Sequence, residues 1–494
     1  MEKEIQLDSN GKRKFGMMDK VAYAAGDLGC NMSFALKGTV QTFWLVFMML
    51  ETGLLSALLL IVQIWDAIND PIIGSMIDAD KRQYKMGKYK TYIFIGACGL
   101  LVAGALVFIP APNAAVWLKA ILFVLGYIVW DACYTVANVP YGSMLSLVTE
   151  NSGERAQLST WRSIGSMFGN ILPTIILPML IWEKATDANG EPIINPETGK
   201  QVENLLGGRV FWAALIMGIF GFACFIFMIK KITIRVDENT VKTGETQKFN
   251  IFAAFKNFAK NRPAVGATVA AMGMFLGMQS ATTANTIMFA THFGMASLSG
   301  IVQMIGFLPM IFFIPFIKKI VDKYGKKEAS VVGTAVSVLG GIIMMIFPLI
   351  KNINASLVVY LIGLVFFGVG LGVYTCVSWA LMGDAIDYNE WKTGNREEGT
   401  VYSLHSFFRK FAQGVGPSVV LLIMGALGYV SELGTSGQSP TTSYNMCWLV
   451  AGLYLFSGIV QFVGIAFIYN IDKKTLEKMN ADLATNRENA ESEA

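Results

Sequence analysis

The stretch IWDAINDPIIGSMID, Ile64–Asp78, lies in a segment that is otherwise apolar enough to cross a membrane, yet it carries several carboxylates. An ionised side chain at the bilayer centre costs about 2.5–3.5 kcal/mol on insertion scales. Asp66 and Asp70 are four residues apart and share one face of an α-helix, with Asn69 on its flank. Charges this close require either a bound cation or a proton on one carboxyl group. Both states describe a cation-coupling site; the alternative is an ion pair with a lysine or arginine of another helix.

The composition of the whole chain indicates that this segment lies in a membrane. Of 494 residues, 54% are hydrophobic and 15% are charged, and the mean hydropathy is +0.50. Apolar runs of about 20 residues, the length that spans a bilayer as a helix, recur along the chain. We therefore expect an all-α integral membrane protein with twelve transmembrane helices. The expected spans are residues 21–49, 53–77, 92–111, 115–147, 158–182, 208–230, 264–292, 297–320, 329–350, 354–383, 399–430 and 445–469.

The charged segments between the spans predict the orientation of the chain. Segments 78–90 and 318–327 each carry five lysines or arginines, so by the positive-inside rule both face the cytoplasm. Residues 183–206 are acidic and are expected outside. An even number of spans then places both termini on the cytoplasmic side of the cell membrane. Because these inward segments account for the net charge of +4, no nucleic-acid partner is implied.

A basic loop divides the expected spans into two groups of six. A weak repeat links the groups, since IDADKRQYKMGKYK at 77–90 resembles VDKYGKKE at 321–328, each after the second span of its half. Parallel repeats of this kind occur in major facilitator transporters, so we expect that fold. The alternative is that any short inward loop collects glycine and lysine. The expected divisions are a cytoplasmic segment 1–20, a six-helix half 21–230, the cytoplasmic loop 231–263, a six-helix half 264–469 and a cytoplasmic tail 470–494.

Polar side chains in other spans indicate a wet cavity. Asp131, Thr135 and Asn138 fall on one stripe of a helix, where threonine can join the ion site and asparagine can bind a sugar hydroxyl. The alternative for each is an interhelical hydrogen bond, worth about 0.6 kcal/mol on average. Roughly seven charges within the spans would oppose insertion by about 20 kcal/mol if they faced lipid. They must therefore line a cavity or pair with one another. Further polar candidates are Asp27, Asn31, Lys37, Tyr134, Arg162, His405, Ser406, Arg409 and Lys410.

Four motifs together resemble one transporter family. They are WDAINDP at 65–71, YTVANVPYGS at 134–143, ERAQLSTWR at 154–162 and GDAIDYNEWKTGNREEGTVYSLHSFFRK at 383–410. From about residue 23 to 469 the chain resembles the glycoside–pentoside–hexuronide:cation symporters, the major facilitator branch that contains melibiose and glucuronide carriers. The resemblance implies sodium, in preference to protons, as the coupling ion, and no other cofactor. It implies a cation site formed by Asp66, Asn69, Asp70 and Thr135, with the carboxylates of Asp66 and Asp70 as ligands of the sodium ion.

The resemblance also implies a class of substrate. Asn31 and Asn138 stand where melibiose carriers have aspartates, and Gly142 stands where they have a stacking tryptophan. The pair Arg409 and Lys410 looks like that of glucuronide carriers, and arginine can bind a carboxylate through two hydrogen bonds. The implied substrate-binding residues are Asn31, Tyr134, Asn138, Arg162, His405, Ser406, Arg409 and Lys410.

Some charged residues have other implied roles. Lys37 and Asp131 have no counterpart in the melibiose-carrier pattern, so we expect them to pair with each other or to gate the site, and Asp27 is a further candidate partner. The resemblance implies a cytoplasmic ion-pair lock between the halves, for which a solvated charged loop is the alternative. The implied lock residues are Asp384, Asp387, Glu390, Arg396 and Glu397.

We therefore expect a symporter that imports a glycoside or hexuronide by alternating access and acts as a monomer in the lipid bilayer. A lysolipid carrier is the alternative transporter, in which Arg409 and Lys410 would hold a phosphate headgroup. An enzyme is not expected, because His292 and His405 are the only histidines and no GxSxG or HExxH motif is present. A non-transporting sugar sensor is the third hypothesis; it would typically need a signalling domain.

Overall fold

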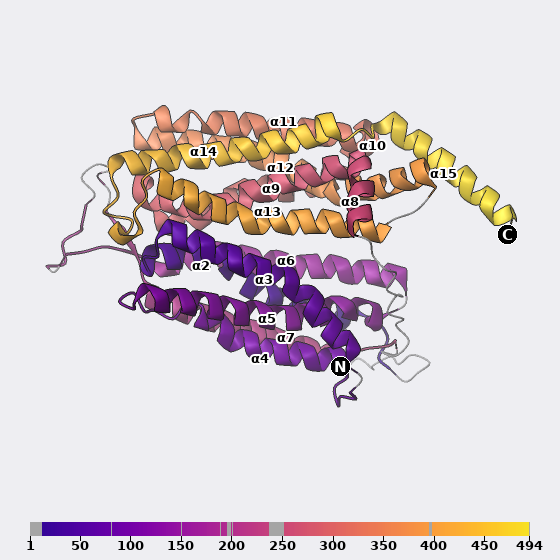
Figure 1. The fold of residues 1–494 in the computed structure, drawn as a ribbon, viewed down its shortest axis with the longest axis horizontal. Helices are drawn as coiled ribbons and strands as arrows, with labels where there is room; N and C mark the ends of the chain where they lie inside the picture. The colour runs from indigo at the N-terminus through magenta and orange to yellow at the C-terminus, as the bar shows by residue number, and fades with distance from the viewer. Residues whose placement is uncertain are drawn as a thin grey trace, which may run out of the picture. The chain divides into compact units, whose positions relative to one another are not determined.

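The computed structural model describes residues 12–80, 82–149, 151–187, 189–194, 199, 201–236, 251–394 and 398–493. The chain divides into two compact units. The first comprises Met1–Ala185 with Glu203–Glu245, and the second comprises Thr186–Val202 with Thr246–Ala494. Each unit is built from long α-helices (Figure 1).

The first unit begins with helices that follow one another almost without a break. Ala35, between α1 and α2, keeps right-handed helical dihedrals, with φ −59° and ψ −23°. Helix α1 packs against α6 and α7, α4 packs against α5 and α7, and α3 packs against α5. The short strands β1 and β2 pair antiparallel. The elements are α1 (Met17–Phe34), α2 (Leu36–Thr42), the π-helical η1 (Phe43–Phe47), α3 (Thr52–Ala79), α4 (Lys88–Leu106), α5 (Val116–Val148), α6 (Ser152–Ile181), β1 (Trp182–Lys184), β2 (Glu203–Leu205) and α7 (Gly207–Lys231).

The second unit has its most extensive helix pairings between α11 and α12 and between α9 and α14. Helix α9 also packs against α13, and α10 packs against α12. The elements are α8 (Ile251–Lys260), α9 (Arg262–Met288), the π-helical η2 (Phe289–Phe293), the 3₁₀ turn η3 (Ala296–Leu298), α10 (Ser299–Tyr324), α11 (Lys326–Met344), η4 (Phe347–Leu349), α12 (Ile353–Thr393), α13 (Glu398–Ala426), η5 (Ser431–Leu433), α14 (Pro440–Val463), the π-helical η6 (Gly464–Ile468) and α15 (Lys473–Glu493).

The repeated segments adopt the same backbone conformation in both units. Gly87 precedes α4 with φ 84° and ψ 155°, and Gly325 precedes α11 with φ 104° and ψ 158°. Only glycine enters this region without strain, because a Cβ atom would clash with the backbone. The glycine of each repeat therefore ends one helix-linking segment and starts the next helix in the same geometry.

Ten helices among the described residues are long and apolar enough to cross a membrane. The expected count of twelve is not confirmed. The two expected spans outside this set are 21–49 and 297–320; the first is helical but carries Asp27, Asn31 and Lys37, which lower its hydropathy. Helix α12 runs for 41 residues, about 60 Å at 1.5 Å per residue, and so continues well past the bilayer.

Close backbone contact brings α1 and α6 together. A Cβ atom added to Gly165 of α6 would lie 2.1 Å from the carbonyl oxygen of Ala24 on α1, and one added to Gly169 would lie 2.6 Å from Cβ of Asn31. Such distances leave no space for a side chain, so the two helices touch through their backbones. This contact sets the register that brings polar side chains of α6 to α1.

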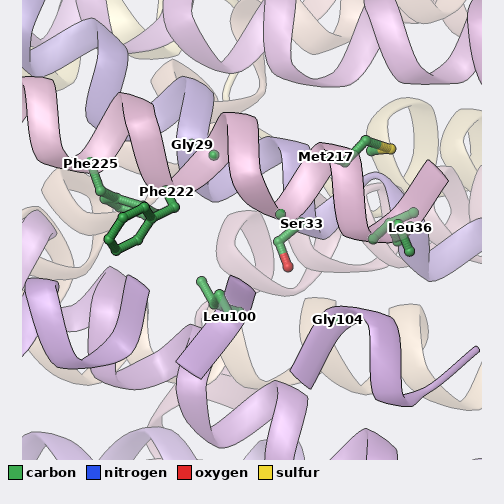
Figure 2. Close-up of a pocket in the computed structure, with 11 residues that line it drawn as sticks. Gly29, Ser33, Leu36, Leu100, Gly104, Met217, Phe222 and Phe225 are labelled. Carbon is green, nitrogen blue, oxygen red and sulfur yellow. The ribbon is translucent and has the colours of Figure 1, made fainter. Parts of the chain in front are cut away.

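A small cavity lies between α1, α4 and α7 of the first unit (Figure 2). Leu100, Phe222 and Phe225 surround it, together with small residues such as Gly29. Ser33 also borders it, and the Ser33 Oγ accepts a 2.7 Å hydrogen bond from Nε1 of Trp130. The lining contains none of the side chains that the sequence predicts for the cation or the sugar. We therefore regard it as a packing defect of the helix bundle.

Candidate functional site

A hydrogen-bonded network joins α3 to α5 within the first unit. The Nδ2 atom of Asn69 donates to Oγ1 of Thr135 at 2.8 Å and to Oδ2 of Asp131 at 3.1 Å. The Thr135 hydroxyl in turn donates to Oδ1 of Asp70 at 2.9 Å. Asn69, Thr135 and Asp131 are all buried. The structure therefore brings three of the four residues of the expected cation set into one network, with Asp131 as an additional member.

The sequence spacing explains why these side chains meet. Asn69 and Asp70 occupy neighbouring positions on α3, and Asp131 and Thr135 are one turn apart on α5. Nearer the start of both helices, Nε2 of Gln63 donates to the hydroxyl of Tyr127 at 3.4 Å. The two helices therefore run in the same direction, which brings polar residues of one beside polar residues of the other.

Lys37 contacts Asp66. Its Nζ atom lies 3.4 Å from Oδ2 of Asp66, and its charge also interacts with the carboxylate of Asp131, which accepts a hydrogen bond from the amide of Asn69. The expected pairing of Lys37 with Asp131 stays a prediction. The ion pair with a lysine of another helix, the alternative raised for the acidic face, is therefore present at Asp66. Whether Lys37 gates the site stays a prediction.

A second network joins α1 to α6. Nε of Arg162 donates to Oδ1 of Asp27 at 3.0 Å, and Nδ2 of Asn31 donates to Oδ2 of the same carboxylate at 3.0 Å. Oδ1 of Asn31 accepts from Nδ2 of Asn170 at 2.7 Å. The guanidinium group of Arg162 also lies over the ring of Tyr141, 5.1 Å from its centroid. The structure therefore groups the substrate candidates Asn31 and Arg162 around Asp27, and adds Asn170, which sequence reasoning missed.

Two further candidates lie on α5. Asn138 is half-buried, and no described residue forms a hydrogen bond with its side chain. The ring of Tyr134 lies 6.0 Å from that of Phe34 in a tilted arrangement. An accessible amide beside an aromatic ring offers a donor, an acceptor and an apolar face.

The candidates of the second unit lie on α13. The guanidinium carbon of Arg409 lies 5.1 Å from the ring centroid of Trp379 and 5.5 Å from that of Phe275. Nε of Arg409 is buried and has no hydrogen-bond acceptor among the described residues. A buried charged donor without an acceptor costs free energy because it has lost its hydration. A ligand that accepts a hydrogen bond from this guanidinium group would remove that cost.

The neighbours of Arg409 differ in their surroundings. His405 is buried, its Nδ1 atom lies 2.9 Å from Oγ1 of Thr268, and its ring meets the edge of Trp379 at 5.7 Å. His405 therefore packs inside the unit and is fixed by a hydrogen bond. Ser406 is half-buried and Lys410 is exposed.

The expected lock residues are only partly described. Oδ1 of Asp384, on α12, accepts from Nζ of Lys326 at 2.6 Å, and this ion pair lies within the second unit. Asp387 and Glu390 lie half-buried on the same helix. Arg396 and Glu397 lie outside the described residues. A lock between the halves stays a prediction.

The sequence pattern that matches this chain is that of the MFS/sugar transport protein family, over residues 22–473. The chain belongs to this family. Relatives of this chain include the uncharacterized symporter YjmB of Bacillus subtilis, which is 28% identical with 96% of each chain covered. The isoprimeverose transporter of Lactiplantibacillus pentosus is 27% identical, covering 94% of this chain and 91% of its own. The glucuronide carrier protein homolog of Escherichia coli is 25% identical, covering 92% and 93%.

The fold of this sugar transporter also resembles solved structures. The nucleoside transporter NupG superposes with a TM-score of 0.58 at 13% identity, covering 92% of this chain and 100% of that one. The expected major facilitator fold is therefore confirmed, and the expected class, a multi-pass membrane transporter rather than an enzyme, is confirmed by the relatives.

The α3–α5 network offers oxygen ligands to a hard cation. Within the described part of the chain, no three His, Cys, Asp or Glu side chains converge as they would around a transition metal. The network instead combines the carboxylate oxygens of Asp70 and Asp131 and the hydroxyl oxygen of Thr135 with the donating Nδ2 atom of Asn69. Hard cations without a redox function take oxygen ligands of these kinds.

Proposed function

We propose that the protein is a sodium-coupled symporter that imports an anionic sugar, a hexuronide or a glycoside bearing a carboxylate. It works by alternating access as a monomer in the cell membrane, with both termini in the cytoplasm. The sodium ion binds at Asp66, Asn69, Asp70 and Thr135. Membership of the sugar transporter family supports transport of a sugar, and the names of its relatives support symport.

The guanidinium group of Arg409 carries the proposal for an anionic substrate. The guanidinium carbon lies over the rings of Trp379 and Phe275, whose π-faces attract the positive charge. Nε is buried without an acceptor among the described residues. A ligand that supplies an acceptor would therefore bind with a more favourable free energy. A carboxylate fits best, since it accepts two parallel hydrogen bonds from the arginine fork. A relative named as a glucuronide carrier homolog supports the same chemistry.

The neutral part of the sugar requires donors and acceptors. We assign the accessible amide of Asn138 to sugar hydroxyl groups, because no described residue pairs with it. Asparagine can donate to one hydroxyl and accept from another. Asn31 and Arg162 act in support, since their hydrogen bonds to Asp27 orient them on α1 and α6.

Transport into proteoliposomes tests the proposal. Purified full-length protein is reconstituted, and uptake of a radiolabelled β-glucuronide is compared with that of isoprimeverose, each with and without an inward sodium gradient. We expect sodium-stimulated uptake of the glucuronide. Equal stimulation by a proton gradient in sodium-free buffer would overturn the choice of ion, and preference for isoprimeverose would overturn the anionic substrate.

A pair of arginine variants makes the substrate test specific. Arg409→Gln should lower glucuronide uptake at least tenfold, because a charge-assisted hydrogen bond contributes about 1.5–3 kcal/mol. The matched control is Arg209→Gln, which removes an exposed ion pair with Glu183 and should leave uptake unchanged. No uptake of either sugar, together with binding of a lysophospholipid that requires Arg409, would support the alternative of a lysolipid carrier.

A further inference from the structure

The ammonium group of Lys37 lies beside Asp66, a carboxylate of the proposed cation site. Its Nζ atom is 3.4 Å from Oδ2 of Asp66, and its charge interacts with the carboxylates of both Asp66 and Asp131. These residues come from α2, α3 and α5 of one unit. The chain therefore supplies a positive charge of its own to the acidic face.

The carboxylates differ in their contact with this charge. Asp70 accepts from the hydroxyl of Thr135, and Asp131 accepts from the amide of Asn69. Asp66 accepts from the ammonium group of Lys37, its one hydrogen-bond partner among the described residues. Asp66 is therefore the carboxylate that Lys37 contacts directly, whereas Asp131 interacts with the same charge without an ion-pair contact.

We propose that Lys37 is a tethered competitor of the coupling cation: its ammonium group and the free ion compete for Asp66, and the ion binds only when Lys37 leaves. This inference rests on the proposed cation coupling. Two positive charges at one carboxylate oxygen repel each other, so the two ligands exclude each other. When the ion dissociates, Lys37 returns and neutralises Asp66, which lets the empty carrier reorient without an exposed negative charge at that position.

The geometry allows Lys37 to leave. Charge-assisted hydrogen bonds from nitrogen to a carboxylate are typically about 2.7–2.9 Å long, so the 3.4 Å contact is a loose one. The Nζ atom also lies 5.0 Å from the ring centroid of Phe34 and 5.9 Å from that of Tyr127. These rings attract the ammonium group after it leaves Asp66, and the Lys37 side chain is 26% exposed.

Sodium binding to the purified full-length protein tests the competition, with radioactive sodium as the probe. Lys37→Met keeps the length of the side chain and removes its charge, so sodium affinity should rise by about tenfold or more. Lys37→Arg keeps the charge, so its sodium affinity should stay near that of the wild type. Lys20→Met is the matched control, because Lys20 also lies over an aromatic ring, that of Phe15, but has no carboxylate partner among the described residues. The gain should vanish in Lys37→Met combined with Asp66→Asn.

A second measurement needs no variant. Wild-type protein is methylated with formaldehyde and dimethylamine–borane, which add no sodium, and modification of Lys37 relative to Lys20 is measured by peptide mass spectrometry. Sodium should accelerate modification of Lys37, whereas an equal concentration of choline should not. Unchanged modification with sodium would overturn the competition.

The two proposals fail in different ways. Sodium-stimulated uptake by the wild type, with unchanged or weaker sodium binding in Lys37→Met, would overturn the competition and leave the symporter intact. Sodium binding that appears only in Lys37→Met would support the competition and overturn sodium coupling of the wild type. If neither protein binds sodium, both proposals are overturned.

Discussion

Nε of Arg162 donates a 3.0 Å hydrogen bond to Oδ1 of Asp27, and the two side chains differ in exposure. The Arg162 side chain is 37% exposed, whereas that of Asp27 is 6% exposed. The pair is therefore asymmetric: the arginine retains access to water when the contact is lost, but the carboxylate does not. Removing one partner should thus have a different cost from removing the other.

This asymmetry predicts unequal losses of stability. Arg162→Met leaves a buried carboxylate without its cation and should lower the free energy of unfolding by about 3–5 kcal/mol. Asp27→Asn leaves a partly exposed arginine and should cost about 1 kcal/mol or less. Thermal unfolding of the two variants in detergent measures the difference. The double variant should be more stable than Arg162→Met alone; additive losses would contradict the coupling.

The hydroxyl of Thr135 predicts a loss of ion binding without a loss of fold. Thr135→Val keeps the shape and removes the group that bridges Asn69 and Asp70, so sodium affinity should fall by about tenfold, or 1.4 kcal/mol. Thr135→Ser should retain most of the affinity. The control is Thr334→Val in α11, whose hydroxyl donates to the carbonyl of Ser330. Equal affinities in all three variants would exclude Thr135 from the ion site.

Local spacing in the sequence predicted part of the candidate site. The i, i+3 and i+4 positions of Asp66, Asn69 and Asp70 place them on one face whatever the helix packs against. The resemblance to the symporter family adds Thr135, which does lie in the network with Asn69. Apolar runs likewise predicted most of the long helices, because a backbone in lipid must satisfy its own hydrogen bonds.

The contacts between helices could not be predicted from the same patterns. Lys37 lies 3.4 Å from Asp66 and its charge also interacts with Asp131, and how close it comes to each carboxylate depends on the relative rotation of α2, α3 and α5. Asn170 reaches Asn31 because α1 and α6 approach closely at Gly165. Neither relation has a local sequence signature.

A buried carboxylate at the start of α1 has no signature in the local sequence for the same reason. Asp19 accepts hydrogen bonds from the side chains of Arg13 and Arg235 and from the backbone N–H groups of Gly16 and Thr233. Its sequence position suggests only a residue of a polar leading segment. The partners come from more than 200 residues away along the chain as well as from nearby, and together they tie the segment after α7 to the start of α1.

This cluster predicts a structural rather than a transport defect. Asp19→Ala leaves the partly buried Arg235 without its carboxylate and should lower the free energy of unfolding by about 3–5 kcal/mol. Thermal unfolding measures the loss. Ion affinity of the folded fraction should match the wild type, because Asp19 contacts none of the ion-site residues. A large change in sodium affinity at unchanged stability would contradict the assignment.

Asp80, just beyond the end of α3 and outside the membrane-spanning segment, should make the stability of the folded state depend on pH. Hydrogen bonds from the hydroxyls of Tyr84 and Tyr92 and from the backbone N–H of Arg82 lower the pKa of Asp80 to about 2. A carboxylate with a lowered pKa stabilises the folded state above its unfolded pKa of about 4 and loses this contribution as the pH falls towards 2. The melting-temperature gap between wild type and Asp80→Asn should therefore be widest above pH 4 and narrow below it. A gap that does not change with pH would exclude this role.

The indole face of Trp379 predicts a selective effect on anionic substrates. Trp379→Leu removes one of the two rings that hold the guanidinium group of Arg409, an interaction worth about 0.5–2 kcal/mol. The Michaelis constant for a β-glucuronide should rise by about fivefold, and uptake of a neutral glycoside should change little. Trp379→Phe keeps an aromatic ring, so its Michaelis constant for the β-glucuronide should lie between those of the wild type and Trp379→Leu. Equal losses for charged and neutral sugars would mean that Trp379 stacks on the sugar ring instead of holding Arg409.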